Sequence, residues 1–416
     1  MNILLINTYQ QRGGAAVACQ RLFKAHQQQG LSVKLLVQEG QQIAHNTTFI
    51  ANSYWQRKKA FTRFTLERLS FLPYERDKRI RFAFSPAQVG VDISQHPLVK
   101  EADVLHLHWI NFGFLSLKSL RKLVQLDKPI VWTLHDMWTF TGGCHYAGTC
   151  NNYVDKCGKC HFLKRPHEKD LSYRIHKKKQ ALFAKANLHV VTCSQWLQSL
   201  AKESSLLRNK AVISIPNPID TQVFQPLAAK AARIDLKLPE SSFLVLFGAM
   251  NVADERKGFR YLEQALQWLR KETTSLPIEL IIFGNVDKLT SWNFPFPVHF
   301  LGSIQDQSIL RKVYAAADVF VLPSLEDNLP NTVMESMACG TPVVAFETGG
   351  LPEMIDPLKN GYLAKYKDAK DLAKGILAIQ DKTVDWSSNA RQKVLDNYTE
   401  ETVSKQYVQL YKSLIK

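Results

Sequence analysis

The chain has 416 residues, of which 45% are hydrophobic and 22% are charged. This length predicts about two domains, each able to bury a core. The sequence contains no apolar run long enough to cross a bilayer, and the stretch MNILLINTYQ lacks the basic region of a signal peptide, so we expect a cytoplasmic protein. The net charge of +16 suggests an acidic partner, which can be nucleic acid, anionic lipid or a diphosphate substrate.

The first predicted element is a short buried strand from Asn2 to Asn7. A turn containing Gly13 and Gly14 follows, and then a helix that ends at Gly30. Glycine lets backbone N–H groups approach an anion at the start of a helix, so a strand, a Gly-Gly turn and a helix can cradle a phosphate. Many α/β proteins use the same pair only to make a tight turn, and both interpretations stay open.

Three further apolar runs predict strands: Val33 to Val37, Val104 to His108 and Ile130 to Leu134. Because helical stretches separate them, we expect an α/β fold with a doubly wound parallel sheet. His108 ends one strand and His135 directly follows another, and ligands bind at the carboxyl ends of such strands. A single histidine at this edge more often packs or caps, so its position alone does not assign a function.

Two runs concentrate the positive charge, Trp55 to Phe84 and Lys164 to Lys179. In the first, aromatic residues and leucines are interleaved with lysines and arginines, which is typical of helices that lie in a membrane interface. The alternative is a solvated helix face, because the stems of Lys and Arg commonly cover apolar surface. The sequence shows no zinc-finger, helix-turn-helix or RNP pattern, and we therefore expect no nucleic-acid partner.

Four of the seven cysteines lie within seventeen residues: Cys144, Cys150, Cys157 and Cys160. The segment is rich in Gly and Asn, and its last two cysteines form a C-x-x-C pair. Reducing conditions keep cytosolic thiols free, and Zn²⁺ takes four thiolates in a tetrahedron, so the sequence predicts a structural zinc site. A redox pair, a disulfide and free structural thiols are the alternatives.

The second half of the chain continues the alternation of strands and helices, beginning with a strand from Phe243 to Ala249. Arg256 and Lys257 stand just before the next predicted helix. There a guanidinium fork and a point charge suit a departing pyrophosphate, and a solvated pair of surface cations is the alternative. A further strand, from Ile278 to Phe283, ends in a turn at Gly284.

The most informative stretch predicts two buried strands, with a loop and a short helix between them that starts after Pro330 and stops at Gly340. Asp327 lies in the loop and Glu335 lies eight residues later in the helix, so both carboxylates can face the binding edge. Carboxylates accept hydrogen bonds from vicinal hydroxyls, and the helix N-terminus favours a developing negative charge, so a polyhydroxylated ligand suits this pattern. An acid that only caps the helix is the alternative.

This stretch resembles the donor-binding element of family 4 glycosyltransferases, in which two glutamates separated by seven residues precede a small-residue helix end and a G-x-P-V-V-A strand. Glu335 matches the second glutamate, and GTPVVA begins at Gly340. Asp327 stands at the position of the first glutamate, with Glu326 beside it. The resemblance implies a GT-B fold of two Rossmann-like doubly wound domains facing each other across a cleft. It also implies retaining transfer of a sugar from a nucleoside-diphosphate donor.

The resemblance assigns roles to residues of this element. Glu335 would hold the ribose hydroxyls, and Asp327 or its neighbour Glu326 would face the transferring sugar. Backbone amides of the loop, here at Asn328 and Leu329, would contact sugar hydroxyls or phosphate. Both acids are therefore expected at the donor site.

The family holds the donor diphosphate with a Lys-Gly pair, matched here by Lys257, and with an arginine that follows a strand glycine. Ala249 occupies that arginine's position, and we expect Arg256 to replace it. The family lodges the nucleotide base at the turn that contains Gly284 here. Because the sequence has no D-x-D pair to chelate a metal, and these cations can carry the diphosphate charge, no catalytic metal is expected.

In the amino-terminal half, the segment TLHDMW matches the place where the family uses a histidine, here His135, to hydrogen-bond the transferring sugar. The turn at Gly13 and Gly14, together with Arg12, would face the donor diphosphate and the acceptor. In a subset of the family, enzymes of colanic-acid and other exopolysaccharide assembly, a similar cysteine-bearing insertion follows the His-Asp pair. We expect it to shape the acceptor pocket.

We predict an acceptor-side domain over residues 1–216 with a Cys-rich insertion at 141–163, a nucleotide-sugar domain over 217–397, and a helix over 398–416 that crosses back to the first domain. The expected function is retaining transfer of a sugar to a glycan or lipid-diphosphate-linked acceptor, in capsule, exopolysaccharide or O-antigen synthesis. The enzyme would be cytoplasmic and peripheral on the inner face of the cytoplasmic membrane, an anionic surface. A sugar-nucleotide epimerase and a basic nucleic-acid-binding protein are the alternatives.

Overall fold

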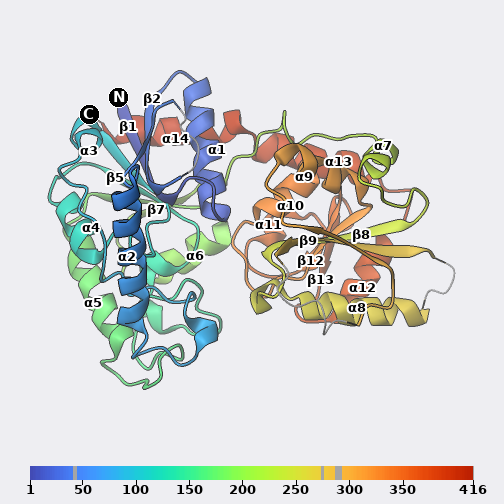
Figure 1. Cartoon of the computed structure of the whole chain (residues 1–416), viewed down its shortest axis with the longest axis horizontal. Helices are drawn as coiled ribbons and strands as arrows, with labels where there is room; N and C mark the ends of the chain where they lie inside the picture. The colour runs from blue at the N-terminus through green and yellow to red at the C-terminus, as the bar shows by residue number, and fades with distance from the viewer. Residues whose placement is uncertain (41–44, 273–275, 286–292, 416) are drawn as a thin grey trace. The chain divides into compact units, whose positions relative to one another are not determined.

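The computed structural model describes residues 1–40, 45–272, 276–285 and 293–415. They form two compact units, each built around one parallel sheet with helices on both faces (Figure 1). The first unit comprises Met1–Pro216 and Ser404–Lys416, and the second comprises Asn217–Val403. Residue 416, the end of the predicted terminal helix, lies outside the described residues.

The sheet of the first unit has the strand order β3-β2-β1-β4-β5-β6-β7, and all neighbouring strands are parallel. Helices α1 and α14 cover one face, and α2, α4 and α5 cover the other (Figure 1). The elements are β1 (Asn2–Tyr9), α1 (Gly14–Gln28), β2 (Ser32–Glu39), β3 (Thr47–Phe49), α2 (Tyr54–Phe71), α3 (Pro97–Glu101), β4 (Val104–Leu107), α4 (Leu117–Val124), β5 (Ile130–Leu134), α5 (Leu171–Phe183), β6 (Leu188–Thr192), α6 (Gln195–Glu203), β7 (Ala211–Ser214) and α14 (Glu400–Leu414).

Local sequence explains where these helices begin and end. Ser53 and Ser116 cap α2 and α4, each in a capping box with the residue three positions later. The predicted helix end at Gly30 is confirmed, because α1 stops at Gln28 and Gly30 takes a φ of +73° that other residues adopt with strain. The strands β1, β4 and β5 are buried on both sides, as the continuous Ile, Leu and Val runs indicate.

The end of α14 packs into the first unit through buried hydrogen bonds. His26 on α1 contacts the hydroxyls of Ser404 and Tyr411 at 2.7 and 3.1 Å. His106 on β4 lies 2.7 Å from the same Tyr411 hydroxyl, and Thr133 on β5 lies 2.9 Å from the hydroxyl of Tyr407. Because buried polar groups are costly when unpaired, these contacts fix the register of α14 on the sheet.

The sheet of the second unit has the order β10-β9-β8-β11-β12-β13 and is also parallel throughout. Helices α8 and α12 lie on one face, and α9, α10 and α13 lie on the other (Figure 1). The elements are α7 (Ala229–Asp235), β8 (Phe243–Asn251), the 3₁₀ turn η4 (Glu255–Lys257), α8 (Phe259–Glu272), β9 (Ile278–Asn285), β10 (Val298–Gly302), α9 (Gln307–Ala316), β11 (Val319–Leu322), α10 (Asn331–Ala338), β12 (Val343–Phe346), α11 (Leu351–Met354), β13 (Gly361–Ala364), α12 (Ala369–Ala378) and α13 (Trp386–Asn397).

The predicted α/β class with doubly wound parallel sheets is confirmed in both units. Two edge strands, β3 and β13, were not predicted, because their sequences, TTF and GYLA, are not continuous apolar runs. The predicted strand from Val104 to His108 ends one residue earlier, so His108 lies just beyond it. Within the described ranges, no helix combines the length and apolar character that a bilayer crossing needs.

Candidate functional site

In the first unit, the histidines predicted at the binding edge contact each other. Nδ1 of His108, after β4, lies 3.0 Å from Nε2 of His135, after β5. The sulfur of Cys193, after β6, lies 3.6 Å from the other ring nitrogen of His135. Burial lowers the pKa of His135 to about 4 and that of His108 well below its usual range. At neutral pH both rings are therefore uncharged hydrogen-bonding groups.

Asp136 is held by three donors. Its carboxylate accepts hydrogen bonds from the indole N–H of Trp109 at 3.0 Å and from the backbone N–H of Trp138 at 2.8 Å, and Nδ1 of His145 lies 2.7 Å away. Burial raises the pKa of Asp136, but His145 and these hydrogen bonds outweigh burial and hold it below its usual value. Asp136 thus stays ionised and organises the loop beside His135.

The Gly-Gly turn lies at the start of α1. Gly13 is the N-cap residue, with a φ of +90°, and its carbonyl accepts the backbone N–H groups of Ala16 and Val17 at 3.1 Å. The guanidinium of Arg12 stands over the ring of Tyr9, 5.5 Å from its centre. A cation and the first turn of a helix therefore lie together at this end of β1.

In the second unit, the predicted cations and the first predicted acid form one cluster. Nζ of Lys257, at the end of η4, lies 2.5 Å from Oδ2 of Asp327. Nη1 of Arg256 lies 3.9 Å from the other carboxylate oxygen, and it donates to the carbonyl oxygen of Glu326 at 2.9 Å. Burial raises the pKa of Asp327, but Lys257 and Arg256 outweigh burial and keep it below its usual value. The cluster is ionised and its charges are largely compensated.

Close backbone approaches hold this cluster in shape. Gly258 has a φ of +68°, and a Cβ there would lie 1.8 Å from the carbonyl oxygen of Pro323 at the end of β11. Gly349 has a φ of +59°, and a Cβ there would lie 1.9 Å from the carbonyl oxygen of Asp327. Gly284 has a φ of +128° and packs on the carbonyl oxygen of Ala249. Only glycine fits these positions, so three turns at this edge of the sheet are sterically fixed.

Glu335 lies one turn into α10 and is 5% exposed. Its Oε2 accepts a hydrogen bond from the hydroxyl of Tyr314, on α9, at 3.0 Å. Asn328 and Leu329 precede α10, whose N-cap residue Pro330 offers no side-chain cap. The helix therefore begins with backbone donors that its own N-cap side chain does not satisfy, shortly after Asp327 in the sequence.

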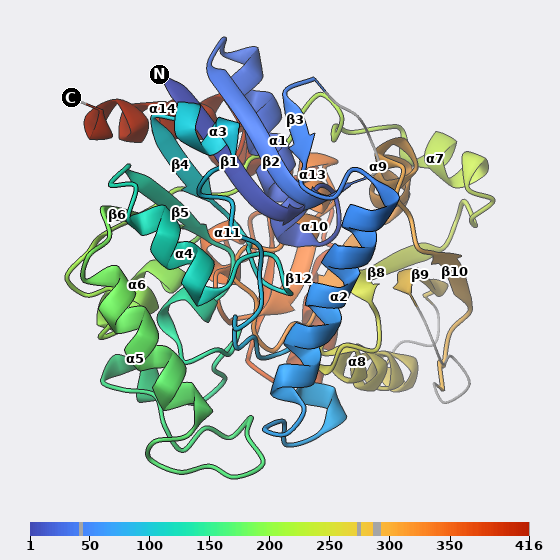
Figure 2. The same cartoon turned by 60° about the vertical axis from the view of Figure 1, so that its left-hand side comes forward.

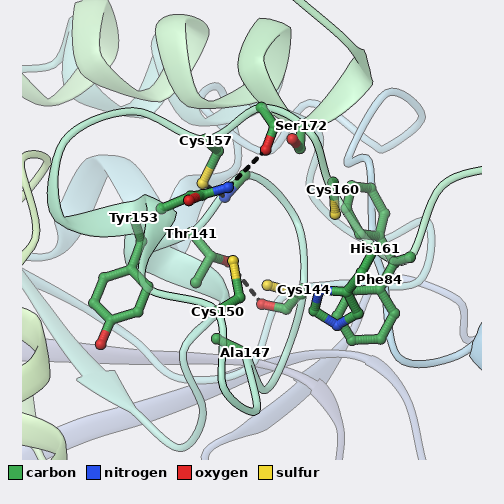
Figure 3. Close-up of a pocket in the computed structure, with 14 residues that line it drawn as sticks. Phe84, Thr141, Cys144, Ala147, Cys150, Tyr153, Cys157, Cys160, His161 and Ser172 are labelled. Carbon is green, nitrogen blue, oxygen red and sulfur yellow. Dashed lines mark hydrogen bonds between the residues drawn. The ribbon is translucent and has the colours of Figure 1, made fainter. Parts of the chain in front are cut away.

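The four clustered cysteines line one small cavity of about 20 Å³, which Figure 3 shows in close-up. Their thiols are free, and the sulfur of Cys157 accepts the backbone N–H of Gly142 at 3.1 Å. Burial raises the pKa of Cys157 to about 12 and that of Cys160 to about 11. In the part of the chain that the structure describes, no three His, Cys, Asp or Glu side chains already stand in an arrangement that could hold a metal ion.

Comparison with known proteins identifies the family. The model described as Glycosyltransferase Family 4 matches residues 12–223, just over half of the chain. The chain belongs to glycosyltransferase family 4. A second model, described as Glycosyl transferases group 1, matches residues 242–382 of the glycosyltransferase. The resemblance read from the sequence is thereby confirmed.

The glycosyltransferase is 27% identical over 369 residues to the putative colanic acid biosynthesis glycosyl transferase WcaC of Escherichia coli strain K12, with 85% of each chain covered. It is 35% identical over 122 residues to the N,N'-diacetylbacillosaminyl-diphospho-undecaprenol alpha-1,3-N-acetylgalactosaminyltransferase of Campylobacter jejuni subsp. jejuni serotype O:2, covering 29% of this chain and 31% of that one. The crystal structure of Anabaena HepE in complex with UDP and glucose matches over 100% of both chains, with a TM-score of 0.65 and 18% identity. The glycosyltransferase thus has the predicted GT-B fold, and neither alternative function gains support.

Several residues that organise these sites were missed in the sequence. His145, which binds Asp136, lies directly beside Cys144, and only the cysteines were singled out. Lys179 is fully buried on α5, and its ammonium group donates to the carbonyl oxygens of Trp138 and Thr141. Nothing in the local pattern distinguishes a lysine in a basic run as buried, so this position could not be found without the fold.

Proposed function

We propose that this glycosyltransferase transfers a sugar, with retention of configuration, from a nucleoside-diphosphate donor to a lipid-linked glycan during synthesis of a surface polysaccharide such as capsule, exopolysaccharide or O-antigen. The observation that carries the proposal is the ionised Lys257–Asp327–Arg256 cluster at the carboxyl end of β11. HepE binds UDP and glucose on a shared fold, WcaC is named for colanic acid synthesis, and the Campylobacter relative is named for a diphospho-undecaprenol acceptor. These relatives support the same classes of donor and acceptor here.

The second unit supplies the donor site in this proposal. The diphosphate competes with Asp327 for Lys257 and is met by Arg256 as well, so charge that develops on the leaving group finds preorganised cations. Asp327, released from Lys257, accepts a hydroxyl of the transferring sugar. Glu335 binds the ribose hydroxyls while Tyr314 holds its second oxygen.

The turns around that site complete donor binding. The amides of Asn328 and Leu329, before α10, contact the sugar or a phosphate, and the fixed turn at Gly284 receives the nucleotide base. Because the cations already compensate the diphosphate, the donor site needs no catalytic metal. The reaction proceeds by front-face displacement, in which the leaving phosphate accepts the proton of the acceptor hydroxyl.

The first unit supplies neutral groups. His135 is uncharged above about pH 4, so it contacts the sugar without drawing the diphosphate toward it. Its ring nitrogen that lies beside the sulfur of Cys193 exchanges that contact for a hydrogen bond with a sugar hydroxyl. His108 orients that ring through their hydrogen bond. The turn at Gly13 and Gly14, with Arg12, faces the anionic part of the donor and acceptor.

A structural zinc ion bound by Cys144, Cys150, Cys157 and Cys160 is part of the proposal. Four free, largely buried thiols around one cavity with room for a single ion support it, as does the N–H donated to the sulfur of Cys157. Binding requires the thiols to turn into the cavity and lose their protons. The ion orders the loop that carries His145 and plays no part in the chemistry.

Product analysis after a donor screen tests the proposed function. The intact protein is first melted with UDP-, GDP- and ADP-sugars, because a donor that binds the folded state raises Tm. The stabilising donor is then incubated with and without a lipid-diphosphate glycan, and the anomeric configuration of the product is read by NMR. We expect an α-linked product from an α-linked donor only when acceptor is present. An altered nucleotide sugar formed without acceptor would instead establish an epimerase.

A further inference from the structure

Helix α2 buries two charged residues and exposes several large apolar ones. Its buried positions are Ala60, Glu67, Arg68 and Phe71, whereas Trp55 and Phe61 are 73% and 64% exposed. Charged side chains are rarely buried and large aromatic side chains usually are, so this orientation departs from the usual amphipathic arrangement. Figure 2 shows α2 running along the outside of the first unit.

Specific contacts fix this orientation. The carboxylate of Glu67 accepts the backbone N–H groups of Ala87, Gln88 and Val89 at 2.7, 3.0 and 2.9 Å. The guanidinium of Arg68 donates to the carbonyl oxygens of Phe84 and Arg81, at 3.0 and 2.6 Å. Rotating α2 to bury its apolar face would break all of these bonds. The exposed apolar face is therefore a stable feature of the folded unit.

The exposed apolar residues are concentrated in this one region. Among the described residues, eighteen large hydrophobic side chains are exposed, and seven of them lie between Tyr54 and Phe82. Six of the seven are on α2 or directly after it, and Phe82 joins them through its stacked contact with Phe64. Single exposed apolar residues are common, but a grouping of this size marks an interaction surface.

Basic residues surround these apolar side chains. Residues 54–84 contain nine Lys and Arg against three Asp and Glu. Each of the acids is already engaged: Glu67 binds three backbone N–H groups, Glu75 pairs with Arg81 at 2.5 Å, and Asp77 pairs with Arg79 at 3.3 Å. The exposed surface of this region is therefore strongly positive.

We propose that the outer face of α2, together with Phe82 and the basic turn before it, docks the first unit onto an anionic lipid bilayer. Aromatic and leucine side chains enter the interface, while the lysines and arginines of the rim meet lipid phosphates and other anionic headgroups. A second copy of this chain is a poor occupant, because the two surfaces would carry the same excess of positive charge.

Ring contacts connect the docking face with the histidine edge of the same unit. Phe82 packs on Phe112 at 5.7 Å between ring centres, and Phe112 packs on Trp109 at 4.7 Å. The indole N–H of Trp109 binds Asp136, next to His135. Phe112 has a φ of +60°, a strained backbone that the packing around it maintains. If the acceptor is lipid-linked, as in the proposed function, docking through α2 brings this edge to the surface that carries it.

Vesicle sedimentation tests the docking without donor or acceptor, so its outcome does not depend on the proposed function. We expect the intact protein to pellet with vesicles of phosphatidylglycerol and phosphatidylcholine, to stay in solution with phosphatidylcholine alone, and to be released by salt. Failure to pellet with the anionic vesicles would overturn the docking whether or not the protein transfers sugar. Docking without transfer would leave this inference intact and overturn the proposed function.

Two variants of α2 and one matched control locate the surface. Lys58→Glu with Lys59→Glu should weaken binding to the anionic vesicles by at least about tenfold, because each lysine near a charged bilayer contributes substantially to attraction. Trp55→Ser with Phe61→Ser should weaken binding by a similar factor by removing the inserted side chains. The same charge change on α12 of the second unit, Lys370→Glu with Lys374→Glu, should leave binding within about twofold of wild type.

Both α2 variants should melt like wild type and transfer sugar to a water-soluble acceptor at the wild-type rate, since their side chains are exposed. Equal loss of binding in the α12 control would mean that net charge alone attracts the protein, and it would overturn the assignment to α2. A wild-type dimer that the Trp55→Ser, Phe61→Ser variant dissociates would assign the face to a second copy instead.

Discussion

The binding edges of the two sheets use opposite chemistry. In the first unit, the edge carries the uncharged rings of His135 and His108, which are hydrogen-bonded to each other, beside the ionised Asp136 that Trp109 binds. In the second unit, the corresponding edge carries the ion pair of Lys257 and Asp327. Both sheets present loops at the carboxyl ends of their strands, so the difference arises from side chains and not from architecture. Uncharged hydrogen-bonding rings suit a glycan, and a pair of cations suits a nucleoside diphosphate.

The largest loss of activity is expected when a cation is removed from the charged edge. Lys257→Ala is expected to lower kcat by about two to three orders of magnitude, because charge on the departing diphosphate loses a preorganised partner. Steady-state kinetics with saturating donor measure this loss. Lys230→Ala, which removes an exposed lysine that pairs with Glu240 at 3.3 Å, is the matched control and should keep wild-type kcat.

Removing Lys257 also leaves the buried Asp327 without its closest cation, and this effect must be separated from catalysis. The double variant Lys257→Ala, Asp327→Asn removes both charges. If it melts normally and is slower than Asp327→Asn alone, the lysine acts on the reaction, because both of these variants lack the carboxylate that accepts a sugar hydroxyl. Recovery of kcat in the double variant would show instead that the single change acted through an unpaired carboxylate.

Acid should weaken the first unit before the second. Burial lowers the pKa of His26 to about 3 and that of His135 to about 4, both below the unfolded value of about 6.5. The neutral rings therefore stabilise the fold fully above about pH 6.5, and this contribution is lost as pH falls toward 4, because the unfolded chain then binds more protons. The lowered pKa of Asp327 supports the second unit until pH falls below about 4.

Hydrogen exchange read by mass spectrometry at pH 7 and pH 4.5 distinguishes the units in one sample. We expect β5 and α14 to lose about tenfold or more in protection, after correction for the intrinsic rate, while β11 and β12 change little. His26→Gln, which no longer titrates in this range, should reduce the difference in α14. A uniform loss of protection across both units would contradict the assignment to the buried histidines.

Glu335→Gln tests the uncharged contacts within the charged edge. We expect the KM for donor to rise about tenfold while the fold persists, because an amide accepts fewer and weaker hydrogen bonds from ribose hydroxyls than a carboxylate does. Tyr314→Phe, which removes only the hydroxyl that orients Glu335, should raise KM by less. Wild-type kinetics in Glu335→Gln would remove Glu335 from the donor site.

The smallest expected effect on rate comes from the cysteine loop. Protein purified without a polyhistidine tag should contain about one zinc per chain, and Cys157→Ser or Cys160→Ser should abolish it and make the loop sensitive to protease. Transfer to acceptor should fall a few-fold while donor hydrolysis stays unchanged. Cys339→Ser, at a buried cysteine outside the cluster, should keep the metal. Metal-free wild-type protein with full transfer activity would exclude the zinc site.

The positions of most strands and of the residues that follow them were predictable, because the sequences of buried parallel strands are short continuous apolar runs. His135 was found in this way, from its place directly after such a run, and the Arg256–Lys257 pair was found from its place just before a predicted helix. The partner of each residue was not predictable. Lys257 and Asp327 are separated by 70 positions, and Glu335 and Tyr314 by 21, so only the folded sheet brings each pair together.

The orientation of α2 was unpredictable for a different reason. Its composition indicates either an interfacial helix or a solvated face, and both interpretations place Glu67 and Arg68 outside. The structure places them inside because the backbone N–H groups of residues 87–89 need an acceptor there. Hydrogen bonds to a loop distant in sequence determine which face of α2 is buried, so the apolar pattern of the helix alone does not predict that face.

Most of α14 belongs to the first unit, so the second unit, Asn217–Val403, lies between two segments of the first unit in the sequence. Dissection of the protein at a single boundary after Pro216 would leave the buried rings of His26 and His106 without Tyr411. Exchange of donor-binding modules between relatives by recombination therefore requires two crossovers, one on each side of the inserted segment. A chimaera that carries its own amino-terminal unit must also carry the matching last thirteen residues.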